Sequence, residues 1–314
     1  MFARSLASIL PELLRYFSAI SVTGPRQSGK TTLCRQVFQT LPYVLLEDPD
    51  TRLFAETDPR QFLAQFPNGA ILDEVQRVPS LFSYLQGVLD ADASRKFVRS
   101  GSQNFLMMAQ ISQSLAGRVG LTTLLPLSWA ELKQPETPLA DWLFYGGYPA
   151  RAERQIPAPV YFASYLQTYL ERDVRSLKNI GDLTLFTRFV KLCAGRVGQL
   201  LNVSSLATDA GISPKTAEAW LSVLETSYVV YRLQPYHQNW GKRLTKTAKL
   251  YFFDTGLLCY LLDIQQPGQV LTHFAYGSIF ENAVLLELMK ADFHAGRRPS
   301  VFVWRDSHGN EVAF

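Results

Sequence analysis

The chain has 314 residues, of which 47% are hydrophobic and 18% are charged, so we exclude a disordered protein and expect two or three domains. Its formal net charge of +4 permits a nucleic-acid partner but does not require one. The three cysteines, Cys34, Cys193 and Cys259, are odd in number and widely spaced, which favours reduced packing residues over a disulfide framework or a metal site. Residues 1–23 lack a small-residue cleavage site, and no apolar run reaches about 18 residues. We therefore expect a cytoplasmic protein without a signal peptide or a spanning helix.

A glycine-rich loop follows the first apolar run, residues 19–22, and precedes a helical pattern at residues 31–39. It fits the pattern G-x-x-x-x-G-K-[ST], in which glycines let the backbone wrap around phosphate oxygens at a helix N-terminus. Lys30 is expected to reach the β and γ phosphates, and Thr31 to offer its hydroxyl to Mg²⁺. An ordinary turn is the alternative, which the strand and helix on either side disfavour. The sequence predicts a nucleoside-triphosphate site formed by Gly24, Pro25, Arg26, Gln27, Ser28, Gly29, Lys30, Thr31 and Thr32.

Two acidic residues follow a later apolar run, residues 70–72. Asp73 is expected to hold Mg²⁺ through water, and Glu74 is the candidate general base that orients and deprotonates an attacking water. The alternative is that both residues begin a solvated loop. Because a phosphate-binding loop accompanies them, we favour the metal and base roles.

Apolar runs at residues 19–22, 43–46, 70–72, 97–98 and 121–125 alternate with helical patterns. This alternation is typical of a parallel sheet covered by helices, and we place the resulting α/β domain at residues 1–126. From residue 127 to residue 182 the strand pattern disappears, and helical segments are separated by proline and glycine. We interpret this segment as a helical lid.

The next segment, residues 183–262, predicts a winged helix. An amphipathic run at residues 183–197 and a short helix at 204–209 lead through a turn to a helix with Ser213 as its N-cap and Pro214 at its first position. Two strand-like runs at residues 228–233 and 249–253 would form the wing.

Between Glu225 and Asp254 the sequence contains no acidic residue, and basic residues alternate with aromatic ones. That composition is typical of a wing that follows a phosphate backbone, so duplex DNA is a candidate partner. The alternative is a protein-binding module, because the second helix carries Glu218 and Glu225 against the single Lys215. The residues proposed for nucleic-acid contact are Lys215 and Thr216 of the second helix, together with Lys242, Arg243 and Lys246 of the basic stretch, which also includes Arg232 and Lys249.

Taken together, the motifs resemble those of bacterial and archaeal ATPases with an AAA-type domain followed by a domain of unknown function numbered 4143 (DUF4143). The resemblance covers essentially the whole chain and rests on GPRQSGKT at residues 24–31, LDEVQ at 72–76, SGSQN at 100–104, SLAGR at 114–118, GGYP at 146–149 and YFFDTG at 251–256. It implies ATP and Mg²⁺ as ligands and assigns γ-phosphate sensing to Ser102, with Gln103 and Asn104 as alternatives. It also makes Arg118 a candidate arginine finger, which would require a homo-oligomer. A structural ion pair within one subunit is the other interpretation of Arg118.

In this family the tail, here residues 263–314, resembles a restriction-type nuclease. Glu281 matches the expected helix glutamate, but the usual Glu-Val-Asp-Phe reads Glu311-Val312-Ala313-Phe314, where the sequence stops. The metal aspartate and the lysine segment are absent from this pattern. We therefore expect a truncated α+β tail without nuclease activity.

The resulting fold prediction is an α/β P-loop sheet with a helical lid, followed by a winged helix and the partial tail. The leading function is an ATPase whose cycle moves the lid and a DNA-contacting winged helix. A nucleotide-gated switch or scaffold with slow hydrolysis is the second interpretation, and an ATP-controlled nuclease is the third.

Overall fold

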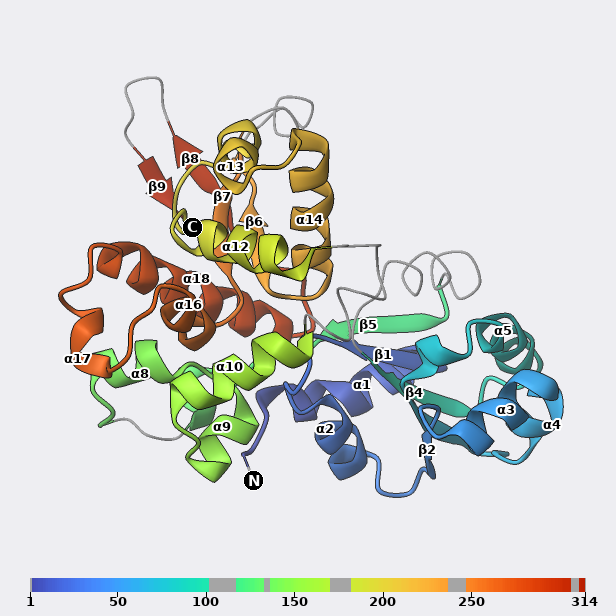
Figure 1. The fold of residues 1–314 in the computed structure, drawn as a ribbon. Helices are drawn as coiled ribbons and strands as arrows, with labels where there is room; N and C mark the ends of the chain where they lie inside the picture. Colours follow the sequence, from blue (N-terminus) through green and yellow to red (C-terminus); the bar gives the residue numbers. More distant parts are fainter. Residues whose placement is uncertain are drawn as a thin grey trace. The chain divides into compact units, whose positions relative to one another are not determined.

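The computed structural model describes residues 2–101, 117–132, 136–169, 182–236, 247–305 and 311–313. The chain divides into two compact units, Phe2–Leu125 with Phe293–Arg297 and Pro126–Asp292 with Arg298–Phe314 (Figure 1). Predictions made for Ser102, Gln103, Asn104, Lys242, Arg243, Lys246 and Phe314 lie outside the described residues. The four-part division predicted from sequence remains a prediction. Among the described helices, none has the length and apolar content needed to cross a membrane.

The first unit contains a parallel five-stranded sheet of order β2-β3-β4-β1-β5, which confirms the predicted α/β class. Its strands are β1 (Ala19–Thr23), β2 (Tyr43–Leu45), β3 (Gly69–Asp73), β4 (Lys96–Ser100) and β5 (Val119–Thr123). Parallel strands point the same way, so the carboxyl ends of β1, β3 and β4 lie at one edge of the sheet. That edge carries the glycine-rich loop, Asp73 and Ser100.

Helices cover both faces of this sheet because successive side chains of each strand alternate between the faces. Ile20, Val22 and Val98 face a core completed by η1 (Ser5–Ser8), α1 (Ile9–Tyr16) and α2 (Lys30–Val37). Ala19 and Phe97 face the other core, formed with α3 (Pro49–Thr57), α4 (Pro59–Ala64), η2 (Val75–Arg77) and α5 (Leu81–Ala91). The near-continuous apolar strands of the sequence are explained by this two-sided burial.

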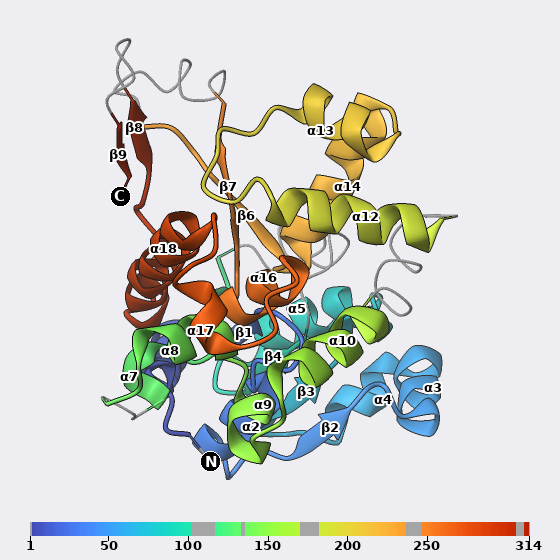
Figure 2. The same ribbon diagram turned by 60° about the vertical axis from the view of Figure 1, so that its left-hand side comes forward.

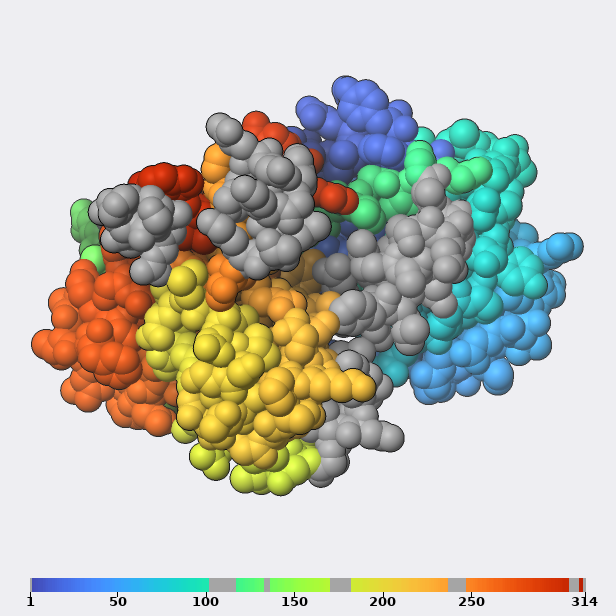
Figure 3. Space-filling view, turned by 90° about the horizontal axis from the view of Figure 1, so that it is seen from above, coloured from blue at the N-terminus to red at the C-terminus, as the bar shows by residue number. Residues whose placement is uncertain are grey.

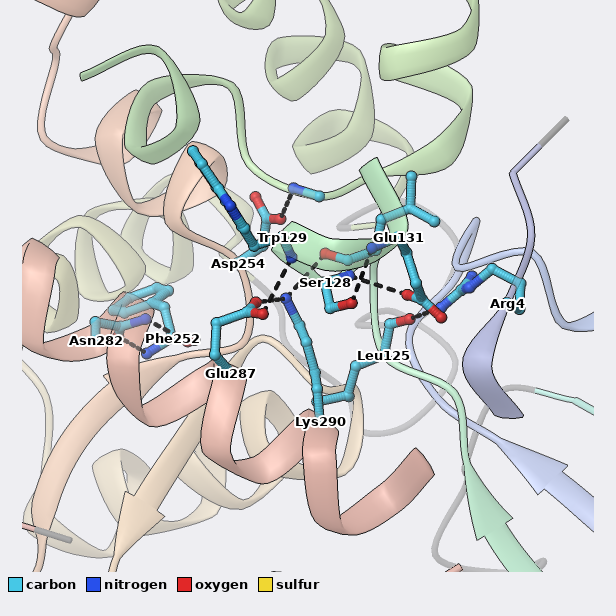
Figure 4. A network of polar contacts seen from close by, with 12 residues as sticks. Arg4, Leu125, Ser128, Trp129, Glu131, Phe252, Asp254, Asn282, Glu287 and Lys290 are labelled. Atoms are coloured by element: carbon cyan, nitrogen blue, oxygen red, sulfur yellow. Dashed lines mark hydrogen bonds and ion pairs between the residues drawn. The ribbon is translucent and has the colours of Figure 1, made fainter. Parts of the chain in front are cut away.

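The second unit contains several helices and a buried aromatic cluster in which Tyr148 contacts Tyr161, Phe162 and Tyr165. The helices are α7 (Trp129–Leu132), α8 (Leu139–Tyr145), α9 (Pro149–Arg154), α10 (Ala158–Tyr169), α16 (Thr255–Leu261), α17 (Pro267–Val270) and α18 (Tyr276–His294). Figure 4 shows α18 anchored on neighbouring segments. Lys290 Nζ donates to Leu127 O at 2.9 Å, and Glu287 accepts from the Trp129 N–H at 3.0 Å.

Two motifs from distant parts of the sequence meet in this unit. Asp254, the N-cap of α16, accepts hydrogen bonds from the backbone N–H groups of Gly147 at 2.8 Å and Leu257 at 2.9 Å (Figure 4). Gly146 adopts φ +62°, and a Cβ there would lie 2.4 Å from an Asp254 carboxylate oxygen. Gly146 is therefore required for close approach to this buried carboxylate, whose pKa is raised by burial.

The remaining helices of the second unit, α12 (Leu183–Ala194), α13 (Val203–Ala210) and α14 (Pro214–Thr226), pack beside β6 (Val230–Leu233) and β7 (Lys249–Phe252) (Figure 2). Trp220 of α14 packs against Phe186 and Phe189 of α12. Ser213 caps α14 and Pro214 is its first residue, as the sequence predicts. In the space-filling view of Figure 3, yellow and gold residues of this segment lie at the surface. A further hairpin pairs β8 (Val303–Arg305) with β9 (Glu311–Ala313).

Substituting Gly69 is expected to destabilise the first unit. Gly69 has φ +101°, and an added Cβ would lie 1.8 Å from Lys96 O, so Gly69→Ala should lower the free energy of unfolding by about 2 kcal/mol or more. Gly87→Ala is the matched control, because no atom lies within 4 Å of its added Cβ. That helical substitution should stabilise by about 0.5–1 kcal/mol. Urea unfolding measures the free energy of unfolding of both variants. Equal values for Gly69→Ala and Gly87→Ala would contradict the role given to Gly69.

Candidate nucleotide site

The glycine-rich loop is held in a tight curve between β1 and α2. Gly24 adopts φ +141° and lies so close to the end of β5 that a Cβ would be 2.2 Å from Leu124 O. Gly29, the N-cap of α2, adopts φ +91°, and Gln27 also has a positive φ of 59°. The first glycine therefore permits close packing, and the second permits the left-handed turn into the helix.

Lys30 is 8% exposed, and its ammonium group lies inside the curve of the loop. Nζ donates to Pro25 O at 2.6 Å and to Gly24 O at 3.1 Å. Burial lowers the pKa of Lys30 to about 8, although the nearby carboxylates of Glu74 and Asp73 oppose this shift. The loop carbonyls thus hold the cation at the place where the motif predicts phosphate contact.

Asp73 is 5% exposed and is the centre of the polar network at the sheet edge. Oδ2 accepts from the hydroxyls of Thr31 and Tyr43, each at 2.8 Å. Oδ1 accepts from the Ser100 hydroxyl and, at 3.1 Å, from the Glu74 N–H. Of these donors, the sequence analysis singled out only Thr31 and Glu74 as site residues. Tyr43 and Ser100 carry a signal, since each is a polar residue at an end of a strand, but nothing in the sequence pairs them with Asp73.

Glu74 lies directly beyond β3 with a left-handed backbone, φ 55°. Its N–H also donates to Ser100 O at 3.0 Å, and its carboxylate accepts a hydrogen bond from Gln76 Nε2. Burial raises the pKa of Glu74, and the charge of Asp73 raises it further, against Arg26, Lys30 and Arg77. The Glu74 carboxylate is thus a stronger base than the carboxylate of an exposed glutamate. The backbone N–H of Glu74 also belongs to the hydrogen-bond network of Asp73.

Arg4 is a part of this site that the sequence analysis missed. Its guanidinium donates to Leu125 O at 2.6 Å (Figure 4) and to Ser28 O at 2.7 Å. Arg4 thus ties the glycine-rich loop to the segment after β5. No motif includes Arg4, which lies far from the loop in sequence. Only the folded chain reveals this contact.

The donor set fits a magnesium–triphosphate complex. Thr31 and Asp73 present adjoining oxygen atoms, the ligands that Mg²⁺ prefers alongside phosphate oxygens and water. Ser28 Oγ is buried in the loop and meets no hydrogen-bond partner among the described residues. Within the same residues, no cluster of three or more His, Cys, Asp and Glu side chains could hold a metal by itself.

Arg118 forms a forked ion pair with Asp90 of α5, with Nε–Oδ1 at 2.5 Å and Nη2–Oδ2 at 3.1 Å. This contact lies within one chain and corresponds to the structural interpretation left open by the sequence. Action on a neighbouring subunit would require Arg118 to leave Asp90.

The basic stretch after α14 is less available than its composition suggests. Arg232 forms ion pairs at 2.5 Å with both Glu218 and Glu225. Lys249 is 4% exposed, and its Nζ contacts Glu281 at 3.0 Å and Glu311 at 2.5 Å.

The two described residues proposed for nucleic-acid contact lie at the start of α14. Lys215 is exposed, whereas the Thr216 N–H and hydroxyl are both bonded to the Ser213 hydroxyl.

Glu281, the expected nuclease glutamate, lies on α18 in a different polar arrangement. It accepts from Lys249 and, at 2.7 Å, from the Tyr251 hydroxyl. The next residue, Asn282, exchanges two hydrogen bonds with the backbone of Phe252 at 2.7 and 2.9 Å. These contacts join α18 to β7.

The fold and the site together define an AAA-type, ATPase-like P-loop domain in the first unit. Residues 16–133 match the AAA_14 family model, described as an AAA domain. Residues 136–268 match a domain of unknown function, DUF8612. This second match corrects the expected DUF4143 domain, because short shared segments such as GGYP do not separate one helical family from another.

The chain is also similar to known proteins over most of its length. Uncharacterised proteins of Mycobacterium bovis and Mycobacterium tuberculosis are each 32% identical over 293 residues, which are 91% of this chain and 65% of each relative. The chain thus spans 65% of the length of these curated relatives. A Walker-type ATPase of Pyrococcus abyssi has a similar fold, with a TM-score of 0.54 at 15% identity over 83% of this chain and 96% of that one.

Nucleotide affinity should weaken as the pH rises through about 8, where Lys30 loses its charge. The charged ammonium attracts phosphate and the neutral amine does not, so the Kd of a fluorescent ATP analogue should rise roughly tenfold between pH 7 and pH 9. The Lys30→Met variant should bind the ATP analogue weakly, and its Kd should not change with pH over this range. A wild-type Kd that stays constant up to pH 9.5 would contradict the lowered pKa.

Proposed function

We propose that the chain binds ATP with Mg²⁺ and hydrolyses it, and that the nucleotide state controls a winged-helix segment at residues 183–262. The observation that carries this proposal is the connected network in which Thr31, Asp73, Glu74 and Ser100 meet beside the Lys30 ammonium. A nucleotide-binding scaffold needs the loop and the metal carboxylate. The adjoining glutamate with a raised pKa is the additional group required for hydrolysis.

Each residue has a defined task in this proposal. Lys30 exchanges the carbonyl oxygens of Gly24 and Pro25 for phosphate oxygens, and Thr31 and Asp73 hold the metal, Asp73 through water. The bound Mg²⁺ supplies charge neutralisation at the phosphates. Glu74 accepts a proton from water while the water oxygen bonds to the γ phosphorus and the bond to the bridging oxygen of ADP breaks. Ser100 keeps the Asp73 carboxylate oriented, and γ-phosphate sensing by Ser102 remains part of the proposal.

Two partners compete for the winged-helix segment. Duplex DNA is supported by the exposed Lys215 at the start of α14 and by Lys242, Arg243 and Lys246 in the sequence. A protein partner is supported by the ion pairs of Arg232 and of the buried Lys249, because these pairs leave less positive charge for a phosphate backbone. The second function, a nucleotide-gated scaffold with slow hydrolysis, rests on these ion pairs. Nuclease activity is not proposed, because the pattern around Ala313 lacks the metal aspartate and Glu281 is bound to Lys249.

Phosphate release from ATP and Mg²⁺ tests the leading function against the scaffold. Lys30→Ala should lose nucleotide binding, whereas Glu74→Gln should retain binding and lose turnover by about 100-fold or more, because only the proton acceptor is removed. Duplex DNA should raise wild-type turnover, and Lys242→Ala with Arg243→Ala should abolish the rise. Binding without wild-type turnover would favour the scaffold, and equal turnover in wild type and Glu74→Gln would exclude Glu74 as the base.

Mixing two inactive variants tests whether Arg118 acts on a neighbouring subunit. Arg118→Ala keeps its own Glu74, and Glu74→Gln keeps its own Arg118, so a mixed homo-oligomer should recover part of the turnover if the finger acts between subunits. Asp90→Asn serves as the control, since it breaks the ion pair without removing the arginine. Loss of stability in Arg118→Ala without recovery on mixing would establish the structural role instead.

A further inference from the structure

Gln76 holds the carboxylate of the candidate base from two residues further along the chain. Its Nε2 donates to Glu74 Oε2. The left-handed backbone of Glu74, φ 55°, turns the chain directly into the short helix η2, which brings the Gln76 amide back over the Glu74 side chain. One oxygen of the carboxylate is thereby fixed by a neutral donor.

The other end of the same amide is buried without a partner. Gln76 Oε1 meets no hydrogen-bond donor among the described residues, although a buried carbonyl oxygen without a donor is energetically unfavourable. Such an atom in a site next to a proposed base indicates a place for a donor that arrives with the substrate.

Gly101 provides the space for this amide. A Cβ at residue 101 would lie 2.5 Å from Gln76 Oε1 and 3.5 Å from Nε2, so the amide packs directly on the glycine backbone. Gly101 follows Ser100, whose hydroxyl binds Asp73. The amide is therefore placed between the end of β4 and the base.

We propose that Gln76 positions the Glu74 carboxylate and that its free carbonyl oxygen is the second acceptor for the attacking water. The water would donate one proton toward Glu74 and the other toward Gln76 Oε1, which leaves an oxygen lone pair directed at the γ phosphorus. The proton is transferred to Glu74, and Gln76 keeps its own protons. This inference rests on the proposed role of Glu74 as the base.

The first test titrates the Glu74 carboxyl group by NMR in the full chain without nucleotide, using ¹³C-labelled glutamate. The Glu74 signal is identified by its loss in Glu74→Gln. Gln76→Met removes the donor that stabilises the carboxylate, so the pKa of Glu74 should rise, and Gln76→Glu should raise it further by adding a like charge. Gln61→Ala, an exposed glutamine, should leave it unchanged. The other charged groups that face Glu74 are unaltered in every variant: Asp73, Arg26, Lys30 and Arg77.

The second test separates turnover from binding. Gln76→Met should lower kcat by about 10- to 100-fold with the Kd of ATP unchanged, and the acidic limb of its pH–kcat profile should move to higher pH. Gly101→Ala should act in the same direction by displacing the amide, and the double variant should be no slower than the slower single variant. Gly87→Ala is the matched glycine control.

The possible outcomes separate this inference from the proposed function. An unchanged Glu74 pKa in Gln76→Met and Gln76→Glu would overturn the positioning role, whether or not the chain hydrolyses ATP. Turnover that needs Glu74 but survives Gln76→Met with an unmoved acidic limb would also overturn it while leaving the proposed function intact. Equal turnover in wild type and Glu74→Gln would instead exclude Glu74 as the base and with it the role of Gln76 in positioning the water, whereas the NMR titration would still test the hydrogen bond between Gln76 and Glu74.

Discussion

The buried carboxylate of Asp73 is the interaction on which the site depends. A carboxylate in a low-dielectric interior is costly unless hydrogen bonds satisfy its oxygens, and here donors from four segments do so. Thr31 follows the glycine-rich loop, Tyr43 begins β2, Ser100 ends β4, and the Glu74 N–H follows β3. Satisfying one charge therefore fixes the ends of three strands and the start of α2. The candidate base Glu74 and the glycine-rich loop adjoin this network.

The buried basic side chains differ in whether hydrogen bonds satisfy their N–H groups. Lys30 donates to the carbonyl oxygens of Gly24 and Pro25, and Arg4 donates to that of Ser28, so both stabilise the curve of the loop. Arg99, directly before Ser100, is buried on the opposite face of β4, where it stacks over the Phe82 ring at 4.6 Å. Its guanidinium has no hydrogen-bond partner among the described residues, and burial lowers its pKa to about 9. Two consecutive residues of β4 therefore have different effects. Ser100 donates a hydrogen bond to Asp73 in the candidate site, whereas Arg99 places an unsatisfied guanidinium in the core.

The second unit shows why charge counted along a sequence overestimates a basic surface. Arg232 and Lys249 belong to a stretch without acidic residues, yet both are paired with glutamates from other elements. In the sequence, Glu218 and Glu225 of α14 precede that stretch, whereas Glu281 and Glu311 follow it by more than 25 residues. An acid-free window in sequence therefore does not imply an acid-free neighbourhood in space. The charge left for a partner depends on residues that β6, β7 and α18 bring together.

The sequence by itself determined the parallel α/β sheet, the glycine-rich loop with Lys30 and Thr31, and the strand that ends at Asp73 and Glu74. These features are local, since they follow from residue spacing, backbone freedom at Gly24 and Gly29, and continuous apolar runs on doubly covered strands. Tertiary structure alone decided the contacts of Tyr43, Ser100, Arg4 and Gln76, and the ion pair that engages Arg118. Most of these contacts join residues far apart in the chain. Their pairing depends on strand order and on the need to satisfy buried polar groups, which no single segment encodes.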